Sequence, residues 1–253
     1  MSVNLVLIGP PGSGKGTQAV RLAKRFSIPH ISTGDILRQA VRDDTPLGRE
    51  VGATIARGSL VSDSLISDLV RERLTRPDTS AGFILDGFPR TAVQARFLDG
   101  ITRGAPLIVA LIEADDEEIV KRLSSRRICQ SCGLTQSVSD LSEGDAESCP
   151  YCGGTLVRRE DDDADTVRRR LATYASFAGP IIEYYRPTPG FIAVNGLQEL
   201  EDVTRALVAK IQRKHAEMRE TSGEPRGDGA IEETDRRSRG DHRGRGGEDG
   251  GSY

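Results

Sequence analysis

Aromatic residues are scarce in this 253-residue sequence, which has no tryptophan and an aromatic content of 4%. Scarce aromatics disfavour a surface that binds nucleic acid by stacking on its bases. No run approaches the ~18 apolar residues that a membrane-spanning helix needs. The first apolar run stops at Ile8 and has no basic stretch before it, so we expect no secretory signal. These absences predict a cytoplasmic protein with no membrane partner.

The sequence also lacks an excess of positive charge. It contains 35 basic and 38 acidic residues, which gives a net charge of -3. This balance argues against a protein held on nucleic acid by bulk charge. The whole net negative charge lies at the end of the chain, where residues 216–253 contain 7 Arg, no Lys and 10 Asp or Glu. That stretch also holds 9 of the 28 glycines and almost no apolar residues beyond Met218. It cannot bury enough surface to offset the entropy of ordering it, so we expect residues 218–253 to form a disordered tail.

The cysteines are few and lie close together, with all four inside one 24-residue stretch. Their pattern is C-x2-C-x16-C-x2-C, which lies within the range expected for a structural zinc site with four thiolate ligands. Two disulfides, or redox-active C-x-x-C pairs, are the alternatives. Stable disulfides are disfavoured without an export signal. The sequence therefore predicts Zn²⁺ bound by Cys129, Cys132, Cys149 and Cys152.

A glycine-rich loop follows the first predicted strand, Val3–Ile8, and leads into a helical pattern with Ala19 and Leu22 on one face. A strand, a glycine loop and a helix in this order are the context of a phosphate-binding P-loop, whose backbone N–H groups converge on phosphate oxygens. The general motif places Ser or Thr directly after the lysine to hold Mg²⁺, whereas here Gly16 intervenes. Magnesium is then held through waters or by another residue. The predicted phosphate-binding residues are Gly12, Ser13, Gly14, Lys15, Gly16 and Thr17.

A second strand, Phe83–Leu85, ends at Asp86, which is our candidate for orienting hydrated Mg²⁺ beside the P-loop. Asp before Gly is also a simple turn signal. Residues Pro106–Ala114 and Gly190–Val194 read as further strands, separated by helical stretches. This alternation predicts a mostly parallel α/β sheet with the phosphate site at the carboxyl ends of its strands.

Two long segments interrupt the alternation and read as lids or substrate clamps. Residues 32–61 show two short helical patterns, Gly34–Val41 and Leu47–Arg57, and residues 126–163 contain the cysteines. Arginine grips phosphate oxygens with a planar fork, and a phosphoryl group in transfer carries charge on several oxygens. The arginines expected around the P-loop are Arg38, Arg90, Arg126, Arg127, Arg159 and Arg170.

The motifs Gly9–Thr17, Ile31–Asp35 and Leu85–Thr91, together with Gln94, resemble those of the adenylate kinases. The cysteine pattern resembles the lineage whose LID holds structural zinc, and the resemblance runs from residue 1 to about 213. It implies a P-loop nucleoside monophosphate kinase fold, with a central parallel sheet flanked by helices. The implied parts are a CORE (1–31, 62–125 and 164–217), an AMP-binding insert (32–61) and a zinc-binding LID (126–163).

The activity that the resemblance implies is reversible phosphoryl transfer from MgATP to AMP, giving two ADP, by a monomer. The P-loop residues would contact ATP, as would Arg122, Arg126, Thr135, Gln136 and Gln198. The AMP pocket would comprise Thr33, Arg38, Ser59, Leu60, Val61, Gly87, Phe88, Pro89, Arg90 and Gln94, with Arg159 and Arg170 on the phosphates. The residues implied in catalysis are Lys15, Asp86, Arg90, Arg126, Arg159 and Arg170. Gln136 stands where the zinc LID of the family often has an aromatic residue.

Two alternatives remain at this point. A kinase for UMP, CMP or GMP would share the P-loop and the arginines, although Thr33 and Gln94 favour AMP. A zinc-ribbon protein that binds nucleic acid could use the P-loop only as a switch. The acidic residues between the cysteine pairs, such as Asp140 and Glu143, weigh against that reading, and we expect no nucleic-acid partner.

Overall fold

The computed structural model describes residues 3–102, 105–131, 135–137, 148–150, 152–159 and 162–221. The chain divides into two units, residues 1–222 and 223–253, and all described residues belong to the first. Residues 222–253 of the predicted tail and the proposed zinc ligand Cys132 lie outside the described residues.

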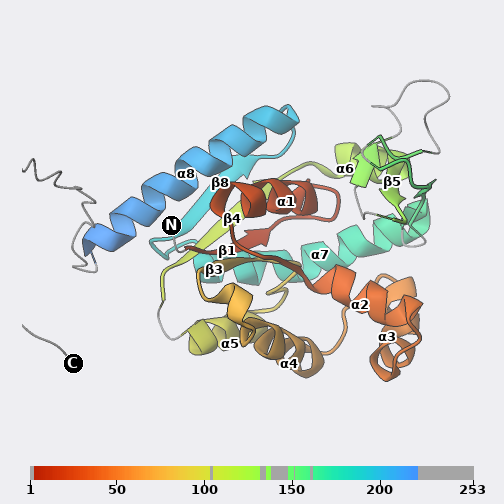
Figure 1. The fold of residues 1–253 in the computed structure, drawn as a ribbon, viewed down its shortest axis with the longest axis horizontal. Helices are drawn as coiled ribbons and strands as arrows, with labels where there is room; N and C mark the ends of the chain where they lie inside the picture. The colour runs from red at the N-terminus through yellow and green to blue at the C-terminus, as the bar shows by residue number, and fades with distance from the viewer. Residues whose placement is uncertain are drawn as a thin grey trace, which may run out of the picture. The chain divides into compact units, whose positions relative to one another are not determined.

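A five-stranded parallel sheet forms the centre of the first unit, in the order β2-β3-β1-β4-β8 (Figure 1). The strands are β1 (Val3–Ile8), β2 (His30–Ser32), β3 (Gly82–Asp86), β4 (Leu107–Glu113) and β8 (Phe191–Asn195). The predicted α/β fold with a parallel sheet is confirmed, and its four predicted strands are present. The sequence did not predict β2, because three residues are too short to show a hydrophobic pattern.

Helices cover both faces of the sheet, and β1 shows why. Leu5 and Leu7 pack on one face in a cluster with Leu22 of α1 and Leu207 of α8, whereas Val6 belongs to the cluster on the other face. Successive side chains of a strand point to opposite faces, so a fully buried strand must be apolar throughout. The helices over the first face are α1 (Lys15–Phe26) and α8 (Leu200–Thr221). Those over the second are α4 (Asp63–Leu74), α5 (Ala92–Thr102) and α7 (Ala164–Tyr185).

The predicted AMP-binding insert folds as two helices, α2 (Thr33–Arg42) and α3 (Pro46–Ala56), close to the predicted ranges. Each begins at a capping side chain, because Ser32 accepts from the Asp35 N–H and Thr45 accepts from the Gly48 N–H. A Cβ at Gly48 would lie 2.0 Å from the Ala40 carbonyl oxygen, so only glycine allows α3 to approach α2 this closely. A short 3-10 turn, η1 (Pro77–Thr79), precedes β3.

The cysteine segment contains a small antiparallel sheet in the order β6-β5-β7. Its strands are β5 (Arg126–Cys129), β6 (Thr135–Ser137) and β7 (Leu156–Val157), and helix α6 (Asp116–Ser125) leads into it. The sequence indicated only a polar, loop-rich segment here. Strands of two to four residues with polar side chains carry too little alternation to be recognised.

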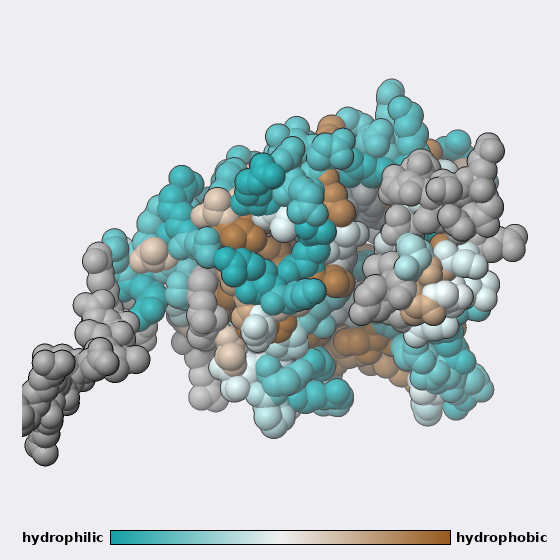
Figure 2. All heavy atoms as spheres, turned by 45° about the horizontal axis from the view of Figure 1, so that its top comes forward, coloured by the Kyte–Doolittle hydropathy of each residue, from teal (hydrophilic) through white to brown (hydrophobic). Residues whose placement is uncertain are grey.

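Helix α8 continues to Thr221, so residues 218–221 are helical and not part of a disordered tail. The predicted start of the tail at residue 218 is therefore wrong. Met218 packs against the cluster that α8 shares with the sheet, so apolar contact extends the helix. Figure 2 shows mainly hydrophilic residues on the face that it presents, with smaller apolar areas between them. Among the described residues, no helix combines the length and apolar character that crossing a bilayer requires.

Candidate functional site

A cavity of about 1200 Å³ opens at the carboxyl ends of the parallel strands. This edge of an α/β sheet is where such folds place ligands. The cavity is lined by residues of the P-loop, the helical insert, the segment after β3, the small sheet and α7. Among the site residues predicted from the sequence, all reach it except Phe88, Arg127, Gln136 and the cysteines. One space therefore collects predicted site residues from Gly12 to Gln198, which are 186 positions apart in the chain.

The P-loop turns sharply from β1 into α1, and glycine makes the turn possible. Gly14 caps the helix with a φ of 96°, in the left-handed region that L-residues rarely adopt. A Cβ at Gly9 would lie 2.4 Å from the Ile112 carbonyl oxygen, so the loop passes directly over β4. Helix α1 has no acidic residue in its first turn, so no side chain there opposes an anion at its N-terminus. The loop and the helix end thus offer a phosphate site.

The Lys15 ammonium group donates to two carbonyl oxygens of its own loop, at 2.8 Å to Gly9 and 2.7 Å to Pro10. Burial, together with the positive charges of Arg90, Arg170 and Arg126, lowers the pKa of Lys15 to about 8 against the opposing effect of Asp86. A cluster of cations around a partly dehydrated lysine is stable only when anionic groups complete it. The electrostatics therefore favour a polyanionic ligand.

Asp86 ends β3 beside the P-loop, where a Cβ on Gly16 would lie 3.4 Å from its Oδ2 atom. Burial alone would raise the pKa of this carboxyl, but His30, whose Nε2 lies 3.6 Å from Oδ2, and the nearby Lys15 hold the pKa below its usual value. An ionised carboxylate next to a phosphate loop fits Mg²⁺, which takes one or two carboxylates together with water and phosphate oxygens.

Asp162, which is fully buried, joins two of the predicted arginines. Arg126 of β5 binds both of its carboxylate oxygens, with Nε at 2.6 Å from Oδ2, and Arg170 Nη1 of α7 lies 3.2 Å from Oδ1. Charge-assisted pairs of this kind fix the direction of a guanidinium group. Asp162 thus orients arginines from the small sheet and from α7 toward one cavity.

Asp35 joins two other predicted arginines in the same way. Its Oδ1 lies 2.5 Å from Arg38 Nη2 and 3.5 Å from Arg159 Nη2. Arg38 belongs to the helical insert and Arg159 to the segment after β7. Arg127 differs from the rest, because it donates to the Arg126 carbonyl oxygen and does not line the cavity.

Most of the predicted AMP-binding residues line the cavity, and several of them contact one another just after β3. Thr33 Oγ1 donates to the Gly87 carbonyl oxygen at 3.0 Å, and Arg90 Nε donates to the same oxygen at 2.8 Å. Ser59, Leu60, Val61, Pro89 and Gln94 also line the cavity. The side chain of Phe88 does not, because it is fully buried in the core with its ring edge-on to Phe97.

Most of the residues predicted to contact the ATP base also line the cavity. Arg122 donates to the Gly196 carbonyl oxygen at 2.8 Å, and Gln198 and Thr135 line the cavity nearby. Gln136 lies on β6 opposite Arg127, and its side chain lies outside what the structure describes.

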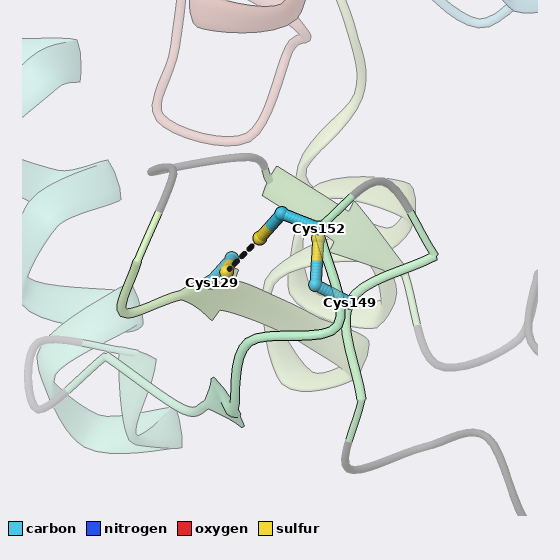
Figure 3. Close-up of side chains that lie close together, drawn as sticks. All are labelled: Cys129, Cys149 and Cys152. Atoms are coloured by element: carbon cyan, nitrogen blue, oxygen red, sulfur yellow. Dashed lines mark hydrogen bonds between the residues drawn. The ribbon is translucent and has the colours of Figure 1, made fainter.

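Three of the four cysteines converge in the small sheet (Figure 3). The sulfur atoms of Cys129, Cys149 and Cys152 all lie within 4.8 Å of one another. Cys129 Sγ and Cys152 Sγ are 3.5 Å apart, much longer than the ~2.05 Å of a disulfide bond. Cysteine sulfurs gathered at this spacing fit the thiolate shell of a tetrahedral zinc ion.

Sequence reasoning missed three carboxylates that organise the site, namely Asp35, Asp63 and Asp162. Asp162 sits in a run of three aspartates, and Asp63 begins α4, where an acid is ordinary. Asp63 contacts Thr91, 28 residues away along the chain, and Asp162 contacts Arg126, 36 residues away, so no local pattern shows these two contacts.

Comparison with known proteins agrees with this geometry. The sequence model of the family described as adenylate kinase matches residues 7–189. The chain is 45% identical over 214 residues to an adenylate kinase of Thermosipho africanus, covering 83% of this chain and 100% of that protein. It is 46% identical over 208 residues to one of Petrotoga mobilis (81% and 95%), and 41% identical over 214 residues to one of Geotalea daltonii (83% and 100%). With relatives this similar matched over nearly their whole length, the chain belongs to the adenylate kinase family.

Proposed function

We propose that the cavity at the carboxyl edge of the sheet is where this enzyme transfers a phosphoryl group reversibly from MgATP to AMP, giving two ADP. The observation that carries the proposal is the meeting of the P-loop lysine, the Asp86 carboxylate and arginines from three parts of the chain in one cavity. The described part of the cavity wall offers no activated nucleophile. Direct transfer between two bound nucleotides needs none, because positioning and electrostatics supply most of its catalysis.

Residue roles follow from the groups that line the cavity. The N–H groups of residues 12–17 would hold the ATP phosphates, and Lys15 would exchange its contacts with Gly9 and Pro10 for phosphate oxygens. Arg90 would hold the phosphate of AMP from the opposite side. Arg126, Arg159 and Arg170 would surround the group in transfer, where charge spreads over three oxygens.

Asp86 would hold hydrated Mg²⁺ beside the loop, in place of the Ser or Thr that usually follows the lysine. Bound magnesium neutralises phosphate charge in such reactions. Asp162 and Asp35 would act before transfer, by keeping the arginines extended into the cavity while it contains no nucleotide.

The cysteine cluster would hold a structural Zn²⁺, with Cys132 as the fourth ligand. A shell of four thiolates leaves no open position for substrate, so the ion would stabilise the small sheet and take no part in the reaction. The domain assignment follows from these roles, with residues 32–61 as the AMP-binding insert and 126–163 as the LID. A monomeric, cytoplasmic state without nucleic-acid partners stays a prediction.

A panel of acceptors tests the proposed function against a UMP, CMP or GMP kinase. The full chain with MgATP is given each of the four monophosphates, and formation of ADP is followed. We expect AMP to be preferred over the others by at least about a hundredfold in kcat/KM. Equal or greater turnover of another monophosphate would contradict the assignment of the Thr33 and Gln94 side of the cavity to adenine.

A further inference from the structure

The side-chain amide of Gln94 is held at both ends by the protein itself. Its Oε1 atom accepts from the backbone N–H of Arg90 at 2.7 Å, and its Nε2 atom donates to Asp63 Oδ1 at 2.8 Å. Gln94 is 2% exposed, yet it lines the cavity, so only one edge of its amide group is open to a ligand in the cavity.

Asp63 is held in turn, by a contact on its other oxygen. Its Oδ2 atom accepts from the Thr91 hydroxyl at 2.8 Å, and Thr91 Oγ1 accepts from the Gln94 backbone N–H at 3.2 Å. Asp63 belongs to α4, whereas Thr91 directly precedes α5 and Gln94 lies in the first turn of α5. The network therefore ties two helices together directly behind the cavity wall.

These contacts determine which end of the amide is oxygen. A flipped amide would turn its NH₂ group toward the Arg90 N–H and its oxygen toward the Asp63 carboxylate, so both contacts would become repulsive. An amide carries two N–H groups and an oxygen with two lone pairs. One N–H and one lone pair remain after the protein contacts, and their order along the edge is fixed.

A fixed donor and acceptor pair distinguishes purine bases. Adenine presents an acceptor at N1 beside a donor at its 6-amino group, which matches a free N–H and a free oxygen lone pair on one amide. Hypoxanthine presents the reverse, a donor at N1–H beside an acceptor at O6. An amide free to flip would pair with either base, whereas a fixed amide pairs with only one.

We propose that Asp63 is a positioning residue for acceptor specificity, which selects adenine over 6-oxopurines by preventing Gln94 from flipping. The proposal rests on the proposed function, in which this side of the cavity binds the base of AMP. Asp63 acts through Gln94 and does not itself touch the base.

Paired kinetics with AMP and inosine monophosphate as acceptors test the proposal. Asp63→Ala releases the Gln94 amide, so kcat/KM for AMP should fall about tenfold, while kcat/KM for inosine monophosphate stays within about twofold or rises. The readout is the ratio of kcat/KM for AMP to kcat/KM for inosine monophosphate, because damage to the fold alone lowers both values together. Asp63→Asn should keep the ratio within about threefold of the wild type. Its amide oxygen can still accept from Gln94, and its NH₂ group can donate to the Thr91 hydroxyl.

Asp68→Ala is the matched control, because Asp68 is an exposed acid of the same helix paired with Arg71 outside the site. It should leave the ratio unchanged, and melting temperatures of all variants show whether each is folded. A parallel loss for both acceptors, or an unchanged ratio in Asp63→Ala, would overturn the role of Asp63 while leaving the proposed function intact. A wild-type chain that phosphorylates no AMP would overturn both.

Discussion

Lys15 shows how a single residue is prepared for its ligand. Its ammonium group bridges the Gly9 and Pro10 carbonyl oxygens, and burial together with three arginines lowers its pKa to about 8. The side chain is therefore already directed along the loop, but its positive charge is unfavourable until an anion arrives. Bound nucleotide phosphate stabilises the charged form, so ATP binding and protonation of Lys15 should be linked.

This linkage predicts that ATP binding takes up a proton near pH 8.5. In the free protein the pKa is about 8, so most Lys15 is neutral at that pH, and bound phosphate raises the pKa. Uptake should be roughly half to one proton per ATP. Calorimetry in two buffers with different ionisation heats measures it, and ATP affinity should fall as the pH rises from 8 to 9. Lys15→Arg stays charged and should show neither effect. Equal heats in both buffers for the wild type would contradict the prediction.

Asp162 and Asp63 illustrate what a sequence leaves hidden at the residue scale. Chemically important side chains with a local motif, such as Lys15 or the cysteines, were predicted. Carboxylates that hold those side chains were not, because Asp162 meets Arg126 and Asp63 meets Gln94 only through the packing of distant elements. A buried aspartate is costly unless it is paired, so its arginines account for its position.

At the scale of elements, sequence patterns predicted those strands whose burial on both faces requires a continuous apolar run. Strands β1, β3 and β4 have that pattern, and the edge strand β8 was recognised by its short apolar run, whereas the edge strand β2 and the small sheet show neither. Among the described residues, the buried cluster of the small sheet consists of Cys129, Cys149 and Leu156. A cluster of this size cannot fold a sheet by hydrophobic burial alone, so metal binding would supply much of its stability.

Zinc removal should therefore unfold residues 126–163 and leave the parallel sheet intact. We expect one zinc per purified chain, and a strong chelator or Cys129→Ser to lower the melting temperature by several degrees. KM for ATP should rise more than KM for AMP, because Arg126 and Thr135, which line the cavity, belong to the segment that contains the cysteines. Metal analysis, melting curves and kinetics measure these effects, and re-addition of Zn²⁺ but not Mg²⁺ should reverse chelation. A metal-free protein with unchanged stability after Cys129→Ser would contradict the assignment.

At the scale of the whole chain, the relatives show how much of the sequence the family fold requires. The Thermosipho protein is matched over its full length by 214 residues of this chain. The residues after α8 combine abundant glycine and charge with few apolar groups, so they offer little to a core. We infer that the enzyme unit ends with α8.

Truncation tests this boundary. Removing residues 223–253 should change the melting temperature by no more than about a degree and leave kcat within about twofold. Ending the chain at Arg213 should instead cost several degrees, because it removes Met218 from its contact with the core. Thermal melts of both truncations measure the difference. If removal of residues 223–253 alone lowered the melting temperature by several degrees, the tail would contribute to the stability of the fold.

The central claim is that this cavity transfers a phosphoryl group between two adenine nucleotides. The most direct measurement is incubation of the full chain with ADP and Mg²⁺ alone, followed by separation of the nucleotides. We predict that ATP and AMP accumulate in equal amounts without release of inorganic phosphate. Lys15→Met should slow the conversion about a thousandfold, equivalent to ~4 kcal/mol of transition-state stabilisation, while remaining folded. Unchanged ADP, release of inorganic phosphate, or a Lys15→Met variant that retains more than about a tenth of the rate would contradict the account.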